Sequence, residues 1–188
     1  IACVPAAVFG LLLDDWMEAH LYNAYVVAAT LIIYGVLFIV LENSSITANP
    51  SITKVGHISA KTALFIGLFQ LLSLIPGTSR SGSTILGAMV LGCSRGAAAE
   101  FSFFLGIPVM FGASFLKLVK FFIKGNALTG PQIFYTILGM LVAFGVSVYS
   151  IQFLMGYVRR HDFKFFGYYR IILGIVVLAY FGITALAS

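Results

Sequence analysis

The residues best suited to chemistry form the run Pro-Gly-Thr-Ser-Arg-Ser-Gly at positions 76–82. One guanidinium, three hydroxyl groups and backbone amides beside glycines could together bind a phosphate or diphosphate. The run lies inside a strongly apolar region, where a charged side chain is costly unless it lines a polar cavity. We therefore predict that Arg80 is catalytic and stabilises charge on a transferring phosphoryl group.

The remaining residues of the run are expected to bind the same anion. Ser79 is predicted to be the second catalytic residue, and the substrate-binding residues are predicted to be Gly77, Thr78, Ser81, Gly82 and Thr84. A structural alternative is that Ser81 or Gly82 precedes an apolar helix and serves as its cap, which is compatible with binding because a helix N-terminus attracts anions. For Arg80 the alternative is a structural pairing with Glu100 or with backbone carbonyls.

Other polar residues in apolar surroundings have weaker assignments. Arg170 is predicted to bind substrate if it faces inward, and otherwise to reach the membrane interface. Glu100 is expected to pair with Arg95 or Arg80, and Gln70 to form a hydrogen bond across a helical hairpin. No histidine or carboxylate pair that could activate a nucleophile lies in the apolar segments, and no metal site is predicted.

The composition is that of a membrane protein. Of 188 residues, 61% are hydrophobic and only 9% are charged, whereas soluble domains carry about 25% charged residues. The net charge of +5 comes from basic residues spread between apolar segments, which argues against a nucleic-acid partner. Cys3 and Cys93 lie far apart in apolar sequence, so we expect two buried thiols and no disulfide.

Segment lengths define the elements that must position the loop. Spanning a bilayer takes about 20 apolar residues, and four segments are long enough, at residues 22–41, 97–122, 131–158 and 166–187. Residues 1–13 are too short to span and are predicted to be the tail of a helix, followed by an acidic loop at 14–18. We expect the chain to be the C-terminal portion of a longer protein.

Residues 61–93 contain the motif and fit no simple span. As one helix they would be about 50 Å long, more than one bilayer core of about 30 Å but too short for two crossings. Because the polar break lies near the middle, we predict two half-helices that form a re-entrant hairpin with the motif at its tip. Such a backbone is tolerated in a membrane only where protein or water surrounds it.

The charges of the loops favour this hairpin. If it returns to its own side, Lys54, Lys61, Arg95 and the basic run at 159–164 all become cytoplasmic, as the positive-inside rule requires. The acidic residues at 14–18 and the C-terminus would then be outside. Three lysines, Lys117, Lys120 and Lys124, are the exception to the rule.

Several motifs together resemble one family. The runs at 67–70 and 76–84, the segment Ser-Arg-x-x-Ala-x-Glu-Phe-Ser-Phe within 94–103, and the pair Tyr169-Arg170 are similar, in this order, to the bacterial undecaprenyl-diphosphate phosphatase family linked to bacitracin resistance. The resemblance covers essentially the whole chain and corresponds to about the last two-thirds of a family member. The family's glutamate-rich and histidine-bearing first motif would lie before Ile1.

The resemblance implies an enzyme that hydrolyses undecaprenyl diphosphate to the monophosphate, recycling the lipid carrier of cell-wall synthesis. It assigns phosphate binding to Ser79 and Arg80, with Ser81 and Thr84 nearby and Arg170 in support. Without the first motif we expect no activity. The rival interpretation is a transporter or flippase of polyprenyl phosphate, because paired broken helices at an anion site are typical of secondary transporters.

The resemblance also implies the architecture and the surroundings. We expect an all-α integral membrane helix bundle that forms the second half of an inverted repeat. Residues 1–42 would finish the first repeat, 43–60 form a cytoplasmic loop, and 61–188 form the second repeat with three spanning helices. The protein is expected in the bacterial cell membrane. Its expected partners are the lipid bilayer and a polyprenyl diphosphate substrate, and a homodimer is possible. A divalent cation, Mg²⁺ or Ca²⁺, is expected, with its ligands outside this chain.

Overall fold

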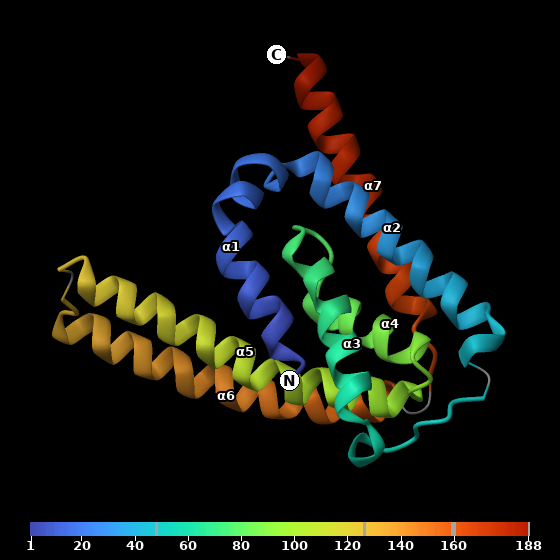
Figure 1. Ribbon diagram of the computed structural model, residues 1–188. Helices are drawn as coiled ribbons and strands as arrows, with labels where there is room; N and C mark the ends of the chain where they lie inside the picture. The colour runs from blue at the N-terminus through green and yellow to red at the C-terminus, as the bar shows by residue number, and fades with distance from the viewer. Residues whose placement is uncertain (48, 126, 159–160, 188) are drawn as a thin grey trace.

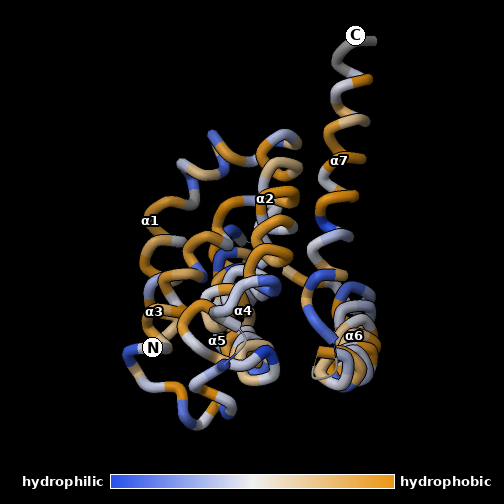
Figure 2. The backbone as a smooth tube through the Cα atoms, turned by 90° about the vertical axis from the view of Figure 1, so that its right-hand side faces the viewer, coloured by the Kyte–Doolittle hydropathy of each residue, from blue (hydrophilic) through white to orange (hydrophobic). Residues whose placement is uncertain are grey.

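The computed structural model describes residues 1–47, 49–125, 127–158 and 161–187. Within these ranges the chain is α-helical, and its only extended pairing is an isolated bridge between Ile52 and Cys93. Among the described residues, four helices are long and apolar enough to cross a membrane, at Ala24–Asn43, Arg95–Ile123, Gly130–Val158 and Lys164–Thr184. Figure 2 shows that apolar residues dominate these helices. The predicted all-α membrane fold is therefore confirmed.

The first two helices meet at a tight corner. Helix α1 covers Cys3–Leu21 and α2 covers Ala24–Asn43, and the side chain of Asn23 caps α2 by accepting a hydrogen bond from the Val26 amide at 2.9 Å. The prediction of an acidic loop at 14–18 is wrong, because α1 continues through these residues. They contain no glycine or proline, and Met17, Glu18 and their neighbours favour a helix.

The motif lies in a hairpin of two short helices, as predicted. Helix α3 covers Ala60–Leu71 and continues as the 3₁₀ turn η3, Leu72–Leu74, and α4 covers Arg80–Val90. Figure 1 shows the hairpin between α1 and α2, with its tip directed toward the corner where those two helices meet. At its base, the loop between α2 and α3 contains two 3₁₀ turns, η1 (Ser45–Thr47) and η2 (Val55–His57).

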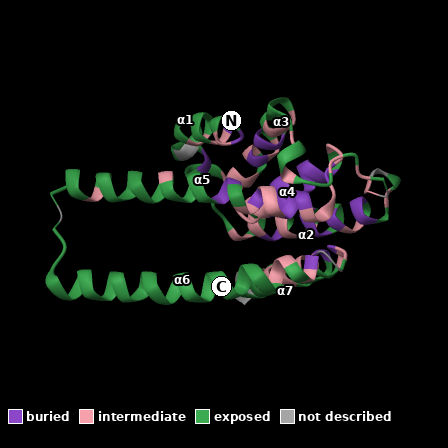
Figure 3. Cartoon of the chain, turned by 90° about the horizontal axis from the view of Figure 1, so that it is seen from below, coloured by how far each residue is buried: buried purple, intermediate pink, exposed green. Residues whose placement is uncertain are grey.

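The three predicted C-terminal spans are all present. Helices α5 (Arg95–Ile123) and α6 (Gly130–Val158) run antiparallel away from the hairpin, and Figure 3 shows α6 exposed almost throughout. Helix α7 (Lys164–Ala187) returns along α2. This packing is close, because a Cβ atom added to Gly167 would lie 2.7 Å from the carbonyl oxygen of Gly35.

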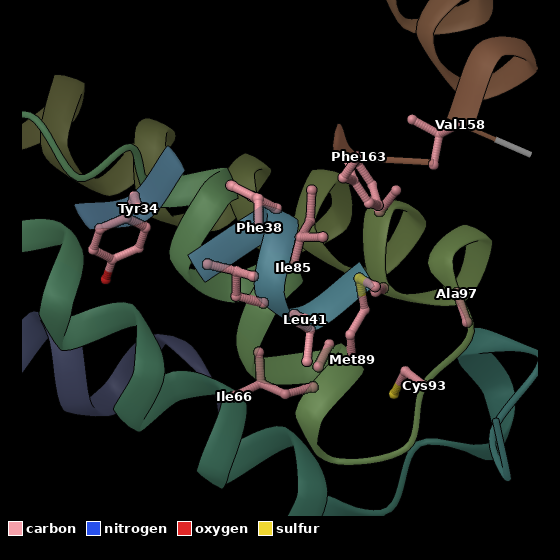
Figure 4. Close-up of a cluster of buried hydrophobic side chains, with 14 residues drawn as sticks. Tyr34, Phe38, Leu41, Ile66, Ile85, Met89, Cys93, Ala97, Val158 and Phe163 are labelled. Atoms are coloured by element: carbon pink, nitrogen blue, oxygen red, sulfur yellow. The ribbon is translucent and has the colours of Figure 1, made fainter. Parts of the chain in front are cut away.

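The core lies where α2, α4 and the start of α5 meet. Figure 4 shows Phe38 and Leu41 of α2 beside Ile85 and Met89 of α4. Cys93 is buried in the same cluster, as predicted. Cys3 is only half-buried, so the prediction that it is buried is wrong. Both thiols are free. The core thus fixes the hairpin against α2.

A charged junction joins three helices at the base of the hairpin. The buried Glu42 carboxylate accepts hydrogen bonds from Nε of Arg95 at 2.9 Å and from the Phe163 amide at 3.0 Å, and it forms an ion pair with Arg95 Nη2. The expected pairing of Arg95 with Glu100 is therefore wrong, since Arg95 pairs with Glu42. Two basic residues of the topology argument, at 159 and 160, lie outside the described residues.

Candidate functional site

The hairpin tip is docked on α2 through its backbone. Thr30 Oγ1 donates a hydrogen bond to the carbonyl oxygen of Pro76 at 2.7 Å. Gly77 follows with a φ of +90°, and a Cβ atom there would collide with Thr30 Oγ1 and with the backbone of Val27. A glycine is therefore required at 77 both for the turn and for the close approach to α2.

Ser79 has a strained backbone at the point where α4 begins. Its φ is +34°, and it is the only described residue other than glycine with a positive φ. Its side chain is exposed, and Oγ accepts a hydrogen bond from the Gly82 amide at 3.3 Å and lies 3.1 Å from Oγ of Ser81. Such strain persists only where the surroundings impose it and is concentrated at functional sites.

The N-terminus of α4 presents free donors beside these hydroxyl groups. The Gly82 amide is taken by the Ser79 side chain and the Ser83 amide by the Ser79 carbonyl. The amides of Arg80 and Ser81 belong to the first turn, where a helix offers no internal acceptor. These two amides and the neighbouring Ser79 and Ser81 hydroxyls thus all lie at the start of α4, an arrangement that suits a phosphate group.

Arg80 lies on the α5 side of the tip. Its Nη1 donates a hydrogen bond to the Ser102 carbonyl oxygen at 3.3 Å, and a Cβ atom added to Gly106 would be 2.6 Å from Nη2. Among the described residues no carboxylate pairs with Arg80. The structural partner of Arg80 is therefore a backbone carbonyl, as one of the two alternatives predicted, and not Glu100. A single bond leaves most guanidinium donors available to an anion.

The two threonines of the motif use their hydroxyl groups within the fold. Thr78 is buried and donates to the carbonyl oxygens of Leu72 at 2.7 Å and Ile75 at 2.6 Å. Thr84 is also buried, and its hydroxyl lies 3.0 Å from the Arg80 carbonyl and 2.6 Å from the Ser102 hydroxyl. These contacts hold the tip and α5 together, while substrate binding by Thr78 and Thr84 stays a prediction.

A second set of polar residues, Tyr34, Ser83 and Arg170, joins α2, α4 and α7. Ser83 donates a hydrogen bond to the Tyr34 hydroxyl at 3.0 Å, and Cζ of Arg170 lies 5.9 Å from the centre of the Tyr34 ring. Nη1 of Arg170 is buried and has no hydrogen-bond partner among the described residues. Tyr34 was visible in the sequence as a polar residue within an apolar span, but its partners are 49 positions away or more.

Two further expectations differ from the structure. Gln70 is 1% exposed, and its amide has no partner within the described ranges, so the predicted hydrogen bond across the hairpin is absent. Glu100 lines a cavity of about 710 Å³ at the base of the hairpin, together with Lys54 and Arg95. No group of three or more His, Cys, Asp or Glu side chains among the described residues could hold a metal ion.

Comparison with known proteins identifies the family. The model of the family described as "Bacitracin resistance protein BacA" matches residues 1–176. Undecaprenyl-diphosphatase of Streptococcus thermophilus is 58% identical over 96% of this chain and 62% of that protein. The corresponding proteins of Streptococcus mutans and Enterococcus faecalis are both 56% identical, over 96% and 95% of this chain and 64% and 63% of their own lengths. The chain thus spans less than two thirds of these relatives. It belongs to the family of the bacitracin resistance protein BacA.

Proposed function

We propose that this chain forms the phosphate-binding part of a membrane phosphatase that hydrolyses undecaprenyl diphosphate to undecaprenyl phosphate. The observation that carries the proposal is the hairpin tip, where the hydroxyls of the exposed Ser79 and the half-buried Ser81 adjoin the first-turn amides of α4. The name of the relatives, undecaprenyl-diphosphatase, supplies the substrate class. Family membership and four apolar helices support a multi-pass protein of the bacterial cell membrane.

The residues of the tip would stabilise the negative charge of the phosphoryl group. In the hydrolysis a water oxygen bonds to the terminal phosphorus, the anhydride P–O bond breaks, and inorganic phosphate and the lipid monophosphate are released. The transferring phosphoryl group spreads negative charge over its oxygens, which positioned donors stabilise. The amides of Arg80 and Ser81 would bind one oxygen, the serine hydroxyls a second, and the Arg80 guanidinium would neutralise the developing charge.

The divalent cation expected from the family stays part of the proposal. The described residues do not supply a set of ligands for it, because Glu42 is bound by Arg95 and Glu100 lies at the base of the hairpin. When bound, such a cation would neutralise the diphosphate oxygens. A homodimer stays an expectation. The transporter interpretation is not favoured, because the relatives are named for a phosphatase activity.

The test uses the intact protein in liposomes that contain undecaprenyl diphosphate. Inorganic phosphate and the lipid products are measured together with movement of the lipid between leaflets. The proposal expects phosphate release, and expects Ser79→Ala to lower the rate by about 100-fold, as loss of one such donor does. Lys54→Ala, at the base of the hairpin, is the control. Lipid movement without phosphate release would refute the phosphatase.

A further inference from the structure

An apolar groove runs along the hairpin between α2, α3 and α4. Its volume is about 220 Å³, and its walls are Leu37 and Val40 of α2, Phe69 of α3, Leu72 of η3, and Leu86 and Val90 of α4. It extends along α2 from Tyr34 to Ser44, which corresponds to about 15 Å of helix. Several wall residues, among them Leu37 and Val40, are exposed in this chain, so the groove is open along one side.

One end of this groove adjoins the proposed phosphate site. Its polar lining at that end consists of Tyr34 and Ser83, which are joined by their hydrogen bond. Ser83 lies four residues after Ser79, the N-cap of α4, and its amide donates a hydrogen bond to the Ser79 carbonyl oxygen at 3.0 Å, so the two residues are one helical turn apart. Arg170 does not line the groove, but its Cζ lies 5.9 Å from the centre of the Tyr34 ring, and its buried Nη1 has no hydrogen-bond partner among the described residues. The groove therefore has a hydrogen-bonding end near a cation, and an apolar body.

We propose that the groove binds the first part of the substrate's polyprenyl chain, an inference that rests on the proposed phosphatase function. An amphiphile with its diphosphate on Ser79 and Arg80 has its hydrocarbon chain start within one helical turn of the groove. A water molecule occupies about 30 Å³ of liquid, and a methylene group is of similar size, so the groove holds roughly seven carbon atoms. That is one to two isoprene units, and the rest of the chain lies in the bilayer.

The groove thereby gives the enzyme a preference for long chains. A diphosphate with a single five-carbon unit reaches only the polar end and leaves the apolar walls in contact with water or lipid. A longer chain buries its next methylene and methyl groups between Leu37, Phe69 and Leu86, and burial of a few such groups accounts for a preference of tenfold or more. An acyl chain of a bulk phospholipid lacks the diphosphate that aligns the substrate with the groove.

The experiment fills the groove at its rim. Leu37 and Val36 are neighbours on α2 and are both 45% exposed, but only Leu37 lines the groove. In the intact protein, Leu37→Trp is expected to lower kcat/KM for undecaprenyl diphosphate about tenfold and to change kcat/KM for a five-carbon prenyl diphosphate less than twofold. Val36→Trp should change both by less than twofold. Equal losses for the two substrates in Leu37→Trp would overturn the proposal.

A binding measurement keeps this test separate from the phosphatase itself. A polyprenyl phosphate with a photoreactive diazirine in its second isoprene unit is expected to label the groove walls on α2 or α4, and Leu37→Trp to reduce that labelling at least fivefold. If the parent hydrolyses neither substrate, the proposed function fails, while the labelling still decides whether the groove binds the chain. Labelling elsewhere, or equal labelling of the groove by a phospholipid with a diazirine in its acyl chain, would refute it.

Discussion

Glu42→Gln is expected to destabilise the protein because it breaks the junction of α2, α5 and α7. The Glu42 side chain is fully buried and accepts hydrogen bonds from Arg95 and from the Phe163 amide. Glutamine has nearly the same shape and can still accept one of these bonds, but it cannot balance the charge of the guanidinium. The main effect is therefore an arginine left without its counter-ion beside a buried amide.

The magnitude follows from the exposure of the two partners. Removal of one member of a buried ion pair costs about 3–5 kcal/mol. The side chain of Arg95 is 41% exposed, so water compensates part of this loss, and we expect about 2 kcal/mol. For a chain of this length 1 kcal/mol shifts Tm by about 2–4 °C, so the expected decrease is about 4–8 °C.

Thermal unfolding in detergent micelles measures this decrease. Asp162→Asn is the control, because the pair Asp162–Lys164 has an N–O distance of 3.7 Å and both side chains are partly exposed. Its Tm should change by no more than about 2 °C. The double variant Glu42→Gln, Arg95→Gln should lose less than the sum of the two single variants. A Tm of Glu42→Gln within 1 °C of the parent would refute the structural role of this junction.

Three further predictions concern the hairpin and its surroundings. Gly77→Ala should lower Tm by at least 4 °C, because a Cβ atom there meets Thr30 and the φ is +90°. The control Gly56→Ala, with open space around the residue, should change Tm by less than 2 °C. Equal effects of the two variants would contradict the docking of the hairpin tip on α2. Ser79→Gly relieves a positive φ, so its Tm should equal that of the parent or exceed it by up to about 3 °C. The same variant should release phosphate more slowly. A clear fall in Tm would show that the backbone at Ser79 is unstrained. Burial raises the pKa of the Cys93 thiol, so maleimide labelling in the folded protein should start at a higher pH than for an exposed thiol; labelling as fast as in denaturant would contradict this.

The hairpin could be predicted from the sequence because length and polarity both constrained it. Residues 61–93 were too long for one span and had a glycine-rich break at the centre, and the structure has two helices there. The acidic loop at 14–18 was predicted from polarity alone. Without a glycine or proline to end it, α1 continued to Leu21 with its charged residues in the last turns.

The tip could be found in the sequence, but the roles within it could not. Its residue types indicated an anion site, and the structure separates exposed hydroxyls from those used within the fold. Thr78 bonds two carbonyl oxygens, while Ser79 and Ser81 stay accessible. The partner of Arg95 was missed because Glu42, 53 positions earlier, had the polarity of a loop residue although it ends a helix. Contacts between distant segments leave no periodic pattern in the sequence.

The central claim is that the hairpin tip stabilises charge on a phosphoryl group through Arg80. Phosphate release from undecaprenyl diphosphate by the intact protein tests this most directly, comparing the parent with Arg80→Ala at matched folding and expression. We expect kcat to fall about 100- to 1000-fold in Arg80→Ala, since the variant loses a donor for the developing charge. An Arg80→Ala variant that releases phosphate at the parent rate would contradict it.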